Sequence, residues 1–471
     1  MLSGLLLSML DQTIVGTALP TIVEDLGGHR WYVWVVSAYL VPATVMIPVF
    51  TRLSDRFGRQ RMLLSGMATF VAASALCAFA QQMPQLVAAR AVQGVGAAAL
   101  EALSFLLVME LAGPTRSARA QLALAGVMTF SFVGGPLAGG ILSDLLGWRS
   151  IFLVNVPLGM AALAVIAVVL PPQVGQREDR RLPVDVAGIA VLTLATGALL
   201  VGLHQHAVVS SWSDSRTGGM VVLGLMGLAL LVLVERRAVA PVLPPRLLAD
   251  PVVGRLLVAG GFATFGLYVL VVLLPRLLQS EQGLSASATG VRMYPFLLAL
   301  LVGVNVGVGL IQSRGRYVVV LVGASAVVMA AAGGFRVWVG GDLYAHMAVL
   351  ALLGLGMGPA LSGLQMVIGR VVAPEDLGAA MGALLLARQV GGAVALAGGE
   401  ALYDVRVAAG TSPMQATGLS VAVIAAGGAA VAGIALLGLR GRDVLAPRPP
   451  ERDRPLTDRL AGQRPPASST T

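Results

Sequence analysis

Fourteen apolar runs follow one another along most of this 471-residue chain. A helix needs about 20 predominantly apolar residues to cross the hydrocarbon core of a bilayer, and most of these runs have that length. The composition agrees, because 57% of the residues are hydrophobic and only 12% are charged, against about 25% charged residues in soluble domains. The sequence therefore predicts an all-α polytopic membrane protein with 14 transmembrane helices.

The arginines indicate how these helices are oriented. The chain contains no lysine, and 15 arginines lie in the connections after even-numbered runs, against 6 in the hairpins after odd-numbered runs. Short cytoplasmic loops carry such an excess of basic residues. We therefore expect both termini in the cytoplasm and the protein in the plasma membrane. The net charge of +9 has its origin in these connections, so it does not indicate nucleic-acid binding. The runs fall near residues 1–22, 31–51, 62–80, 85–109, 119–143, 149–170, 184–205, 218–235, 252–277, 288–311, 317–338, 343–366, 377–402 and 417–439.

The two longest polar connections divide the chain. They bracket runs 7 and 8, which predicts a six-helix bundle at 1–170, a linker with two extra transmembrane helices at 171–250 and a second six-helix bundle at 251–440. The tail at 441–471 is rich in Pro, Arg and Ser, so we expect it to be disordered. "RLSDRFGRQR" after run 2 is echoed by "QSRGRYV" after run 10. Paired halves of this kind are typical of transporters whose halves rock about a central site.

Charged residues inside the runs are the candidate functional groups. Asp11 has about ten residues of an apolar run on either side, a depth at which a charge costs about 2.5–3.5 kcal/mol on insertion scales. Arg90 and Glu101 are eleven residues apart, which places them on one face of a helix but about 16 Å from each other. Asp11 could approach either of them. The alternative is a buried ion-pair network that only fixes packing. Further polar candidates inside the bundle are Gln93, Asn155, Asn305, Arg388 and Gln389.

Two short motifs predict specific local structure. In "TRLSDRFGRQR", between runs 2 and 3, Gly58 permits a tight reversal and Asp55 can cap the next turn or pair with an arginine. The arginines alone are also typical of a membrane anchor. In "SFVGGPLAGG", in run 5, Gly135, Pro136, Gly139 and Gly140 would allow bending and close helix packing.

Taken together, these motifs resemble the major facilitator superfamily, and in particular its fourteen-helix drug:proton antiporter branch. The connection after run 2 is similar to the signature G-x-L-x-D-R-x-G-R-[RK]; Thr51 and Gln60 depart from it, while Asp55, Arg56, Gly58 and Arg59 match. "LDQTIVGTALP" in run 1, "RAVQGVGAAAL" in run 4 and "RQVGG" in run 13 also fit the branch, as does "SFVGGPLAGG", with Ser131 at its first Gly.

The resemblance implies gating by the connection after run 2, proton coupling through Arg90, and export. We therefore expect a proton-coupled exporter of lipophilic, cationic drugs that works by alternating access. A carboxylate deprived of water gains a proton more readily. Asp11 is our first choice for the proton carrier and Glu101 the second, with Arg90 biasing both by its charge. Expected partners are the substrate, protons and the lipid bilayer, with the protein as a monomer.

Other classes are weighed on what the chain contains. A lysine-free chain cannot form a Walker loop, so we expect the proton gradient and no cofactor to drive transport. A membrane-embedded enzyme would need a catalytic polar cluster near one interface, and the sequence shows none. A receptor or structural protein would not need titratable groups in the middle of the membrane. His29, His204 and His206 lack carboxylate or thiol neighbours, so no metal site is expected. A proton-coupled uptake symporter and an exporter of an endogenous metabolite or lipid stay as alternatives.

Overall fold

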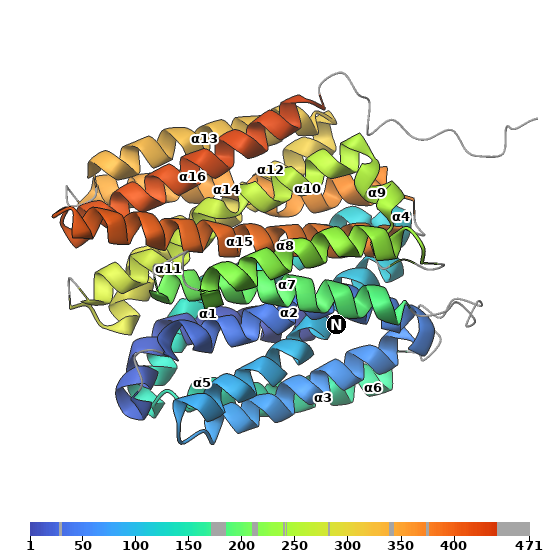
Figure 1. Ribbon diagram of the computed structural model, residues 1–471, viewed down its shortest axis with the longest axis horizontal. Coiled ribbons are helices and arrows are strands. Elements are labelled where there is room, and N and C mark those ends of the chain that lie inside the picture. Colours follow the sequence, from blue (N-terminus) through green and yellow to red (C-terminus); the bar gives the residue numbers. More distant parts are fainter. Residues whose placement is uncertain are drawn as a thin grey trace, which may run out of the picture. The chain divides into compact units, whose positions relative to one another are not determined.

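The computed structural model describes residues 1–27, 31–170, 185–209, 215–238, 241, 243–280, 283–338, 343–373 and 376–439, and within these ranges the regular elements are helices (Figure 1). They are α1 Leu2–Leu26, α2 Tyr32–Phe57, α3 Arg59–Ala78, α4 Met83–Leu146, α5 Ser150–Leu153, α6 Asn155–Val169, α7 Val186–Val209, α8 Ser215–Glu235, α9 Pro245–Ala249, α10 Pro251–Ala263, α11 Phe265–Ser280, α12 Ala286–Arg314, α13 Tyr317–Trp338, α14 Leu343–Val371, α15 Leu377–Ala408 and α16 Pro413–Leu437. The predicted tail at 441–471 lies outside the described residues.

Every predicted apolar run is helical, but the count of fourteen spans is not confirmed. Among the described residues, 11 helices are long and apolar enough to cross a membrane, or 12 if the bent pair Trp34–Ile47 and Val49–Phe57 forms one span. The difference arises partly at α7, whose apolar stretch Ala187–Leu203 is short, and partly at α4, which joins runs 4 and 5. The protein is thus an all-helical membrane protein with at least 11 candidate spans in its described part.

The prediction of a loop between runs 4 and 5 is wrong, because α4 is helical throughout Met83–Leu146. Its contacts nevertheless require two arms. Arg90 and Ser131 both bond to α1 within two residues of each other, at Asp11 and Thr13 respectively. A straight helix would separate positions 90 and 131 by about 60 Å. The chain therefore reverses direction between them, and the two arms flank α1 as two predicted spans would.

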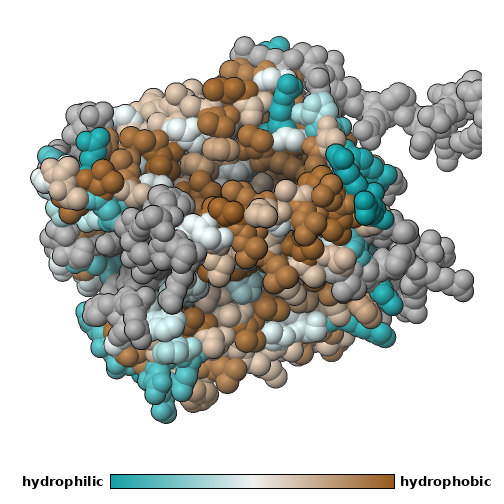
Figure 2. Space-filling view, in the orientation of Figure 1, coloured by the Kyte–Doolittle hydropathy of each residue, from teal (hydrophilic) through white to brown (hydrophobic). Residues whose placement is uncertain are grey.

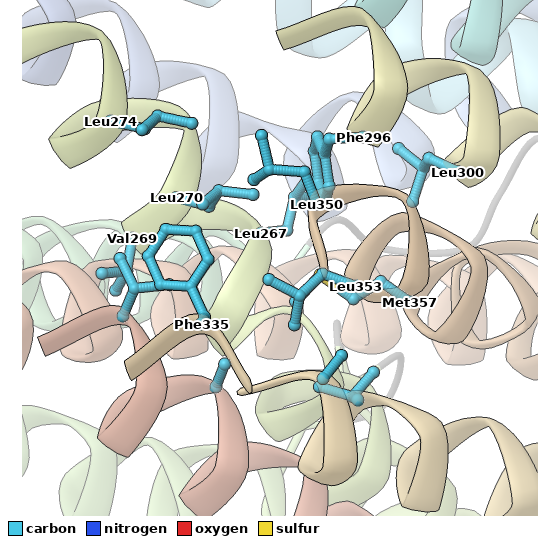
Figure 3. Packing of buried hydrophobic residues seen from close by; sticks show 14 of the residues in the cluster. Leu267, Val269, Leu270, Leu274, Phe296, Leu300, Phe335, Leu350, Leu353 and Met357 are labelled. Atoms are coloured by element: carbon cyan, nitrogen blue, oxygen red, sulfur yellow. The ribbon is translucent and has the colours of Figure 1, made fainter. Parts of the chain in front are cut away.

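Helices α12 and α14 pack through glycines. A Cβ added at Gly303 of α12 would come 2.4 Å from the carbonyl oxygen of Leu355, and one at Gly354 of α14 would come 2.1 Å from that of Phe296. Glycine permits this approach of two backbones, which supplies packing where lipid gives no hydrophobic drive. The close approach sets one side of an apolar core that α11, α12, α13 and α14 share (Figure 3).

The two extra helices, α7 and α8, form a close hairpin. A Cβ at Gly224 of α8 would come 2.6 Å from the backbone nitrogen of Leu199 in α7. Leu199 also belongs to a buried cluster with Val45 of α2 and Ala393 of α15. The hairpin therefore contacts both a helix of the predicted first bundle and one of the predicted second bundle. The domain boundaries at 170 and 250 stay predictions.

The outer surface is apolar in the way a lipid-facing surface requires. On α8, Val222, Leu223, Met226 and Leu233 are exposed. Figure 2 shows hydrophobic residues over most of the middle of one face, with hydrophilic residues gathered towards its ends. Such a face suits the hydrocarbon core, with polar groups at the two interfaces.

Candidate functional site

Asp11, near the middle of α1, is 1% exposed and forms an ion pair with Arg90 of α4. Arg90 Nη1 lies 2.5 Å from Asp11 Oδ2. The second carboxylate oxygen, Oδ1, accepts hydrogen bonds from Gln93 Nε2 at 2.9 Å and from Asn155 Nδ2 at 2.7 Å. The structure thus brings four of the predicted polar residues into one cluster, in which the charge of Asp11 is compensated.

Helices α2 and α3 complete this cluster. The ring centroid of Tyr39, on α2, lies 4.1 Å from Arg90 Cζ, a cation–π geometry. Ser74 Oγ, on α3, accepts hydrogen bonds from Gln93 at 2.7 Å and from Asn155 at 3.1 Å. We did not predict Tyr39 or Ser74, because a single tyrosine or serine in an apolar helix carries no motif.

Glu101 lies on the same arm of α4 in a different environment. It is 2% exposed, the described residues give it no ion pair, and its Oε1 has no hydrogen-bond partner among them. Its neighbours on the helix, Ala98 and Ala102, pack with Ile47 of α2 and Leu385 of α15. Glu101 therefore sits where α4 and α2 of the first predicted bundle meet α15 of the second. We call this region the seam.

A second buried charge lies on α15. Arg388 is 5% exposed, and its Nη2 donates hydrogen bonds to the carbonyl oxygens of Ala360, at 3.0 Å, and Leu361, at 2.6 Å, in α14. Its Nε has no hydrogen-bond partner in the described part of the chain. The described residues also offer Arg388 no carboxylate within ion-pair distance, in contrast to Arg90.

Tyr268 of α11 connects these two charges. Its hydroxyl donates a hydrogen bond to Gln389 Oε1, and its ring lies against Gly392, where an added Cβ would come 2.5 Å from two ring atoms. The phenol interacts electrostatically with both Glu101 and Arg388. The "RQVGG" motif therefore supplies the cation of Arg388, the amide of Gln389 and, at Gly392, the space that the Tyr268 ring occupies. Tyr268 itself was missed, since its partners come from other helices.

The connection after α2 is a charged turn. Gly58 has φ 92° and links α2 directly to α3. Arg59 contacts Glu110 of α4 and lies 3.7 Å from Asp55, so Asp55 pairs with an arginine, one of its two predicted roles. Arg56 Cζ lies 5.5 Å from the centroid of the phenyl ring that follows it.

The glycines of run 5 lie against α1. Gly135, Pro136, Gly139 and Gly140 are all buried. A Cβ at Gly139 would come 2.6 Å from the carbonyl oxygen of Ile14, and one at Gly135 would come 1.9 Å from Thr13 Oγ1, so the second arm of α4 packs directly on the helix that carries Asp11.

We expect Gly139→Ala to destabilise the protein by roughly 1–3 kcal/mol, the usual cost of forcing a group into a packed interface. The measurement is the melting temperature of the purified protein in detergent. Gly126→Ala is the matched control on the same arm, because its Cβ would meet no atom within 4 Å. Equal melting temperatures of the two variants would contradict the packing described here.

Asp25, near the far end of α1, accepts hydrogen bonds from Trp148 Nε1 and Arg149 Nη1, each at 2.9 Å. These two hydrogen bonds hold the pKa of the Asp25 carboxyl below its ordinary value, and the bond from Trp148 has the larger effect. The carboxylate is about half exposed, so solvent screens the pair and its contribution is below about 1 kcal/mol.

The sign of this contribution sets its pH dependence. Because the folded state favours the ionised form, the stabilisation is complete above the unfolded pKa of about 3.9 and is lost as the pH falls through the lower folded pKa. We expect the wild type to melt slightly above Asp25→Asn at pH 5–7, and the gap to close below about pH 4. A gap that widens on acidification would refute this assignment.

One prediction about a polar residue is wrong. Asn305 does not join a polar contact inside a bundle: it is exposed, and its Nδ2 donates to the carbonyl of Leu301 on its own helix at 2.9 Å. His29 and the side chains of His204 and His206 lie outside the described residues.

Charges of both signs buried between membrane-spanning helices are typical of proteins with a substrate or ion pathway. The comparisons give the family. The model of the Major Facilitator Superfamily matches residues 1–396, and this chain belongs to that superfamily. Its relatives are named transporters, so the chain is a transporter and not an enzyme.

Individual relatives differ in their identity to this chain and in the share of each chain that the similarity covers. The Multidrug transporter protein MdtP of Bacillus subtilis is 30% identical over 83% of this chain and 73% of its own length. An MFS-type transporter of Mycobacterium tuberculosis, Rv1877, is 33% identical over 85% of this chain, which covers 58% of that relative. The crystal structure of the human organic anion transporter MFSD10 has a TM-score of 0.66, 17% identity and coverage of 92% and 97%, which shows a shared fold.

Proposed function

We propose that this transporter is a proton-coupled exporter of lipophilic, cationic small molecules. The observation that carries the proposal is the contrast between two buried carboxylates. Asp11 has an ion pair with Arg90, whereas Glu101 has no cation among the described residues. A buried charge without a partner is costly, and a carboxyl group avoids that cost by taking a proton or a bound cation.

Exchange follows from competition at one carboxylate. Glu101 holds either a proton or the substrate's positive charge, and each expels the other. Glu101 lies at the seam, so a relative movement of the two predicted halves would expose it to one side of the membrane and then to the other. Tyr39 holds the Asp11–Arg90 pair in place, because its ring lies on Arg90 and its hydroxyl donates to the carbonyl oxygen of Ser8 in α1. We therefore place Glu101 ahead of Asp11 as the proton carrier and give the Asp11–Arg90 pair a positioning role.

Several observations support the substrate class and the direction. MdtP carries a multidrug name, and the run 5 motif of this chain resembles that of antiporters. Apolar side chains line the seam, and a lining of this kind suits lipophilic molecules without strict shape demands. We infer that the protein works as a monomer in the plasma membrane with both termini in the cytoplasm, and that the proton gradient drives it without a cofactor.

The test is transport in proteoliposomes with an imposed pH gradient, with tetraphenylphosphonium as the lipophilic cation. An acidic lumen is expected to drive accumulation of the cation, and nigericin is expected to abolish it. Accumulation driven instead by acid outside would indicate a symporter. Transport that ignores the pH gradient would overturn proton coupling.

A further inference from the structure

Arg388 faces the same region as Glu101. Successive residues of a helix are about 100° apart, so Leu385, Arg388, Gln389 and Gly392 share an arc of about 100° on α15. Leu385 packs at the seam against α2 and α4, and Gln389 and Gly392 hold Tyr268. Arg388 therefore belongs to the face of α15 that borders the seam through Leu385, and its guanidinium reaches from this face to the carbonyl groups of α14.

The guanidinium of Arg388 is hydrogen-bonded only in part, and its charge is not neutralised. Two carbonyl oxygens of α14 accept from Nη2, yet a carbonyl carries no net charge, and Nε stays without a partner among the described residues. A carboxyl group such as that of Glu101 can become neutral by binding a proton, but a guanidinium stays charged at any accessible pH. A buried charge without a counter-charge destabilises the protein. A bound ligand with a negative charge would supply the counter-charge that the described residues do not give Arg388.

We propose that Arg388 binds an anionic group of the substrate, so that the preferred substrates are amphoteric lipophilic molecules with a cationic group at Glu101 and a carboxylate at Arg388. This inference rests on the proposed function, because it concerns the same site. Tyr268 lies on this face of α15, where its hydroxyl donates to Gln389 and its ring lies against Gly392, and an aromatic side chain of this kind suits the apolar body of the ligand. Gly392 and Gln389 fix that ring. Arginine suits the role because its planar donors match a carboxylate in two places.

The experiment compares two dyes that differ only at the carboxylate: rhodamine 110, with a free carboxylate, and rhodamine 123, its methyl ester. Binding to the purified full chain is measured by fluorescence anisotropy at pH 7.5. We expect wild-type protein to bind rhodamine 110 at least about tenfold more tightly, and Arg388→Gln to abolish the preference. Equal dissociation constants in the wild type overturn the proposal, and so does an unchanged preference in the variant.

Controls separate this proposal from the underlying function. Arg255→Gln removes a cation of α10 whose Nη1 donates to the Gly438 carbonyl, and it should keep the preference. Should Arg388→Gln not fold, Arg388→Lys replaces it: a reduced preference is then expected, since an ammonium lacks the two-pronged geometry, and an undiminished one counts against the proposal. If rhodamine 123 is exported with the pH gradient but rhodamine 110 has no advantage, the proposed function survives and this inference fails.

Discussion

In proteoliposomes, Glu101→Gln is expected to reduce accumulation of tetraphenylphosphonium driven by an acidic lumen to the level of protein-free vesicles. The amide keeps the size of the side chain but can neither take a proton nor carry a negative charge. Removing one member of a buried charge pair costs about 2–5 kcal/mol, so affinity for the cation should fall at least about tenfold. The protein should fold normally, because Glu101 has no ion pair among the described residues to lose.

The matched control is Glu24→Gln, which removes an exposed carboxylate from the far end of α1. This variant should accumulate the cation like the wild type. Retained accumulation in Glu101→Gln, with tetraphenylphosphonium still following the pH gradient, would remove Glu101 as the exchanging group and return Asp11 to first place.

Asp11→Asn is expected to cause the largest loss of stability of the changes considered. The guanidinium of Arg90 is 1% exposed, and without Asp11 it would be a buried charge without a counter-charge. Breaking a buried pair from one side costs about 3–5 kcal/mol. We expect a large fall in melting temperature in detergent and loss of proton-coupled efflux, with the protein still reaching the membrane.

A double-mutant cycle separates the pair from its members. Arg90→Gln should cost about as much as Asp11→Asn, but Asp11→Asn with Arg90→Gln should cost less than the sum, because neither charge then stays unpaired. Additive effects would show that the two residues act independently. That result would contradict the ion pair, in which Arg90 Nη1 lies 2.5 Å from Asp11 Oδ2. A stable double variant that still follows the pH gradient would make the pair purely structural.

Parts of the site were predictable because a helix has a fixed period. The depth of Asp11 follows from its place in an apolar run, and the cost of a charge there predicts a partner. Arg90 was a candidate because a charge inside an apolar run is penalised when it faces lipid, so Arg90 was expected to face the interior of the bundle. Asn305 shows the limit of that reasoning: an amide can satisfy itself on its own helix, and no sequence pattern distinguishes that outcome from a contact between helices.

The sequence by itself determined that this chain is a bundle of membrane-spanning helices with charges at mid-depth, since the length of an apolar run and the cost of burying a charge are local properties. Only the tertiary structure decided which charges are paired. Asp11 meets Arg90 across 79 positions of sequence, and Glu101 and Arg388, on different helices, are left without counter-charges in the described part of the chain. Pairing depends on how helices distant in sequence pack side by side, and glycine contacts such as that of Gly139 with Ile14 set that packing through shape rather than through any periodic signal.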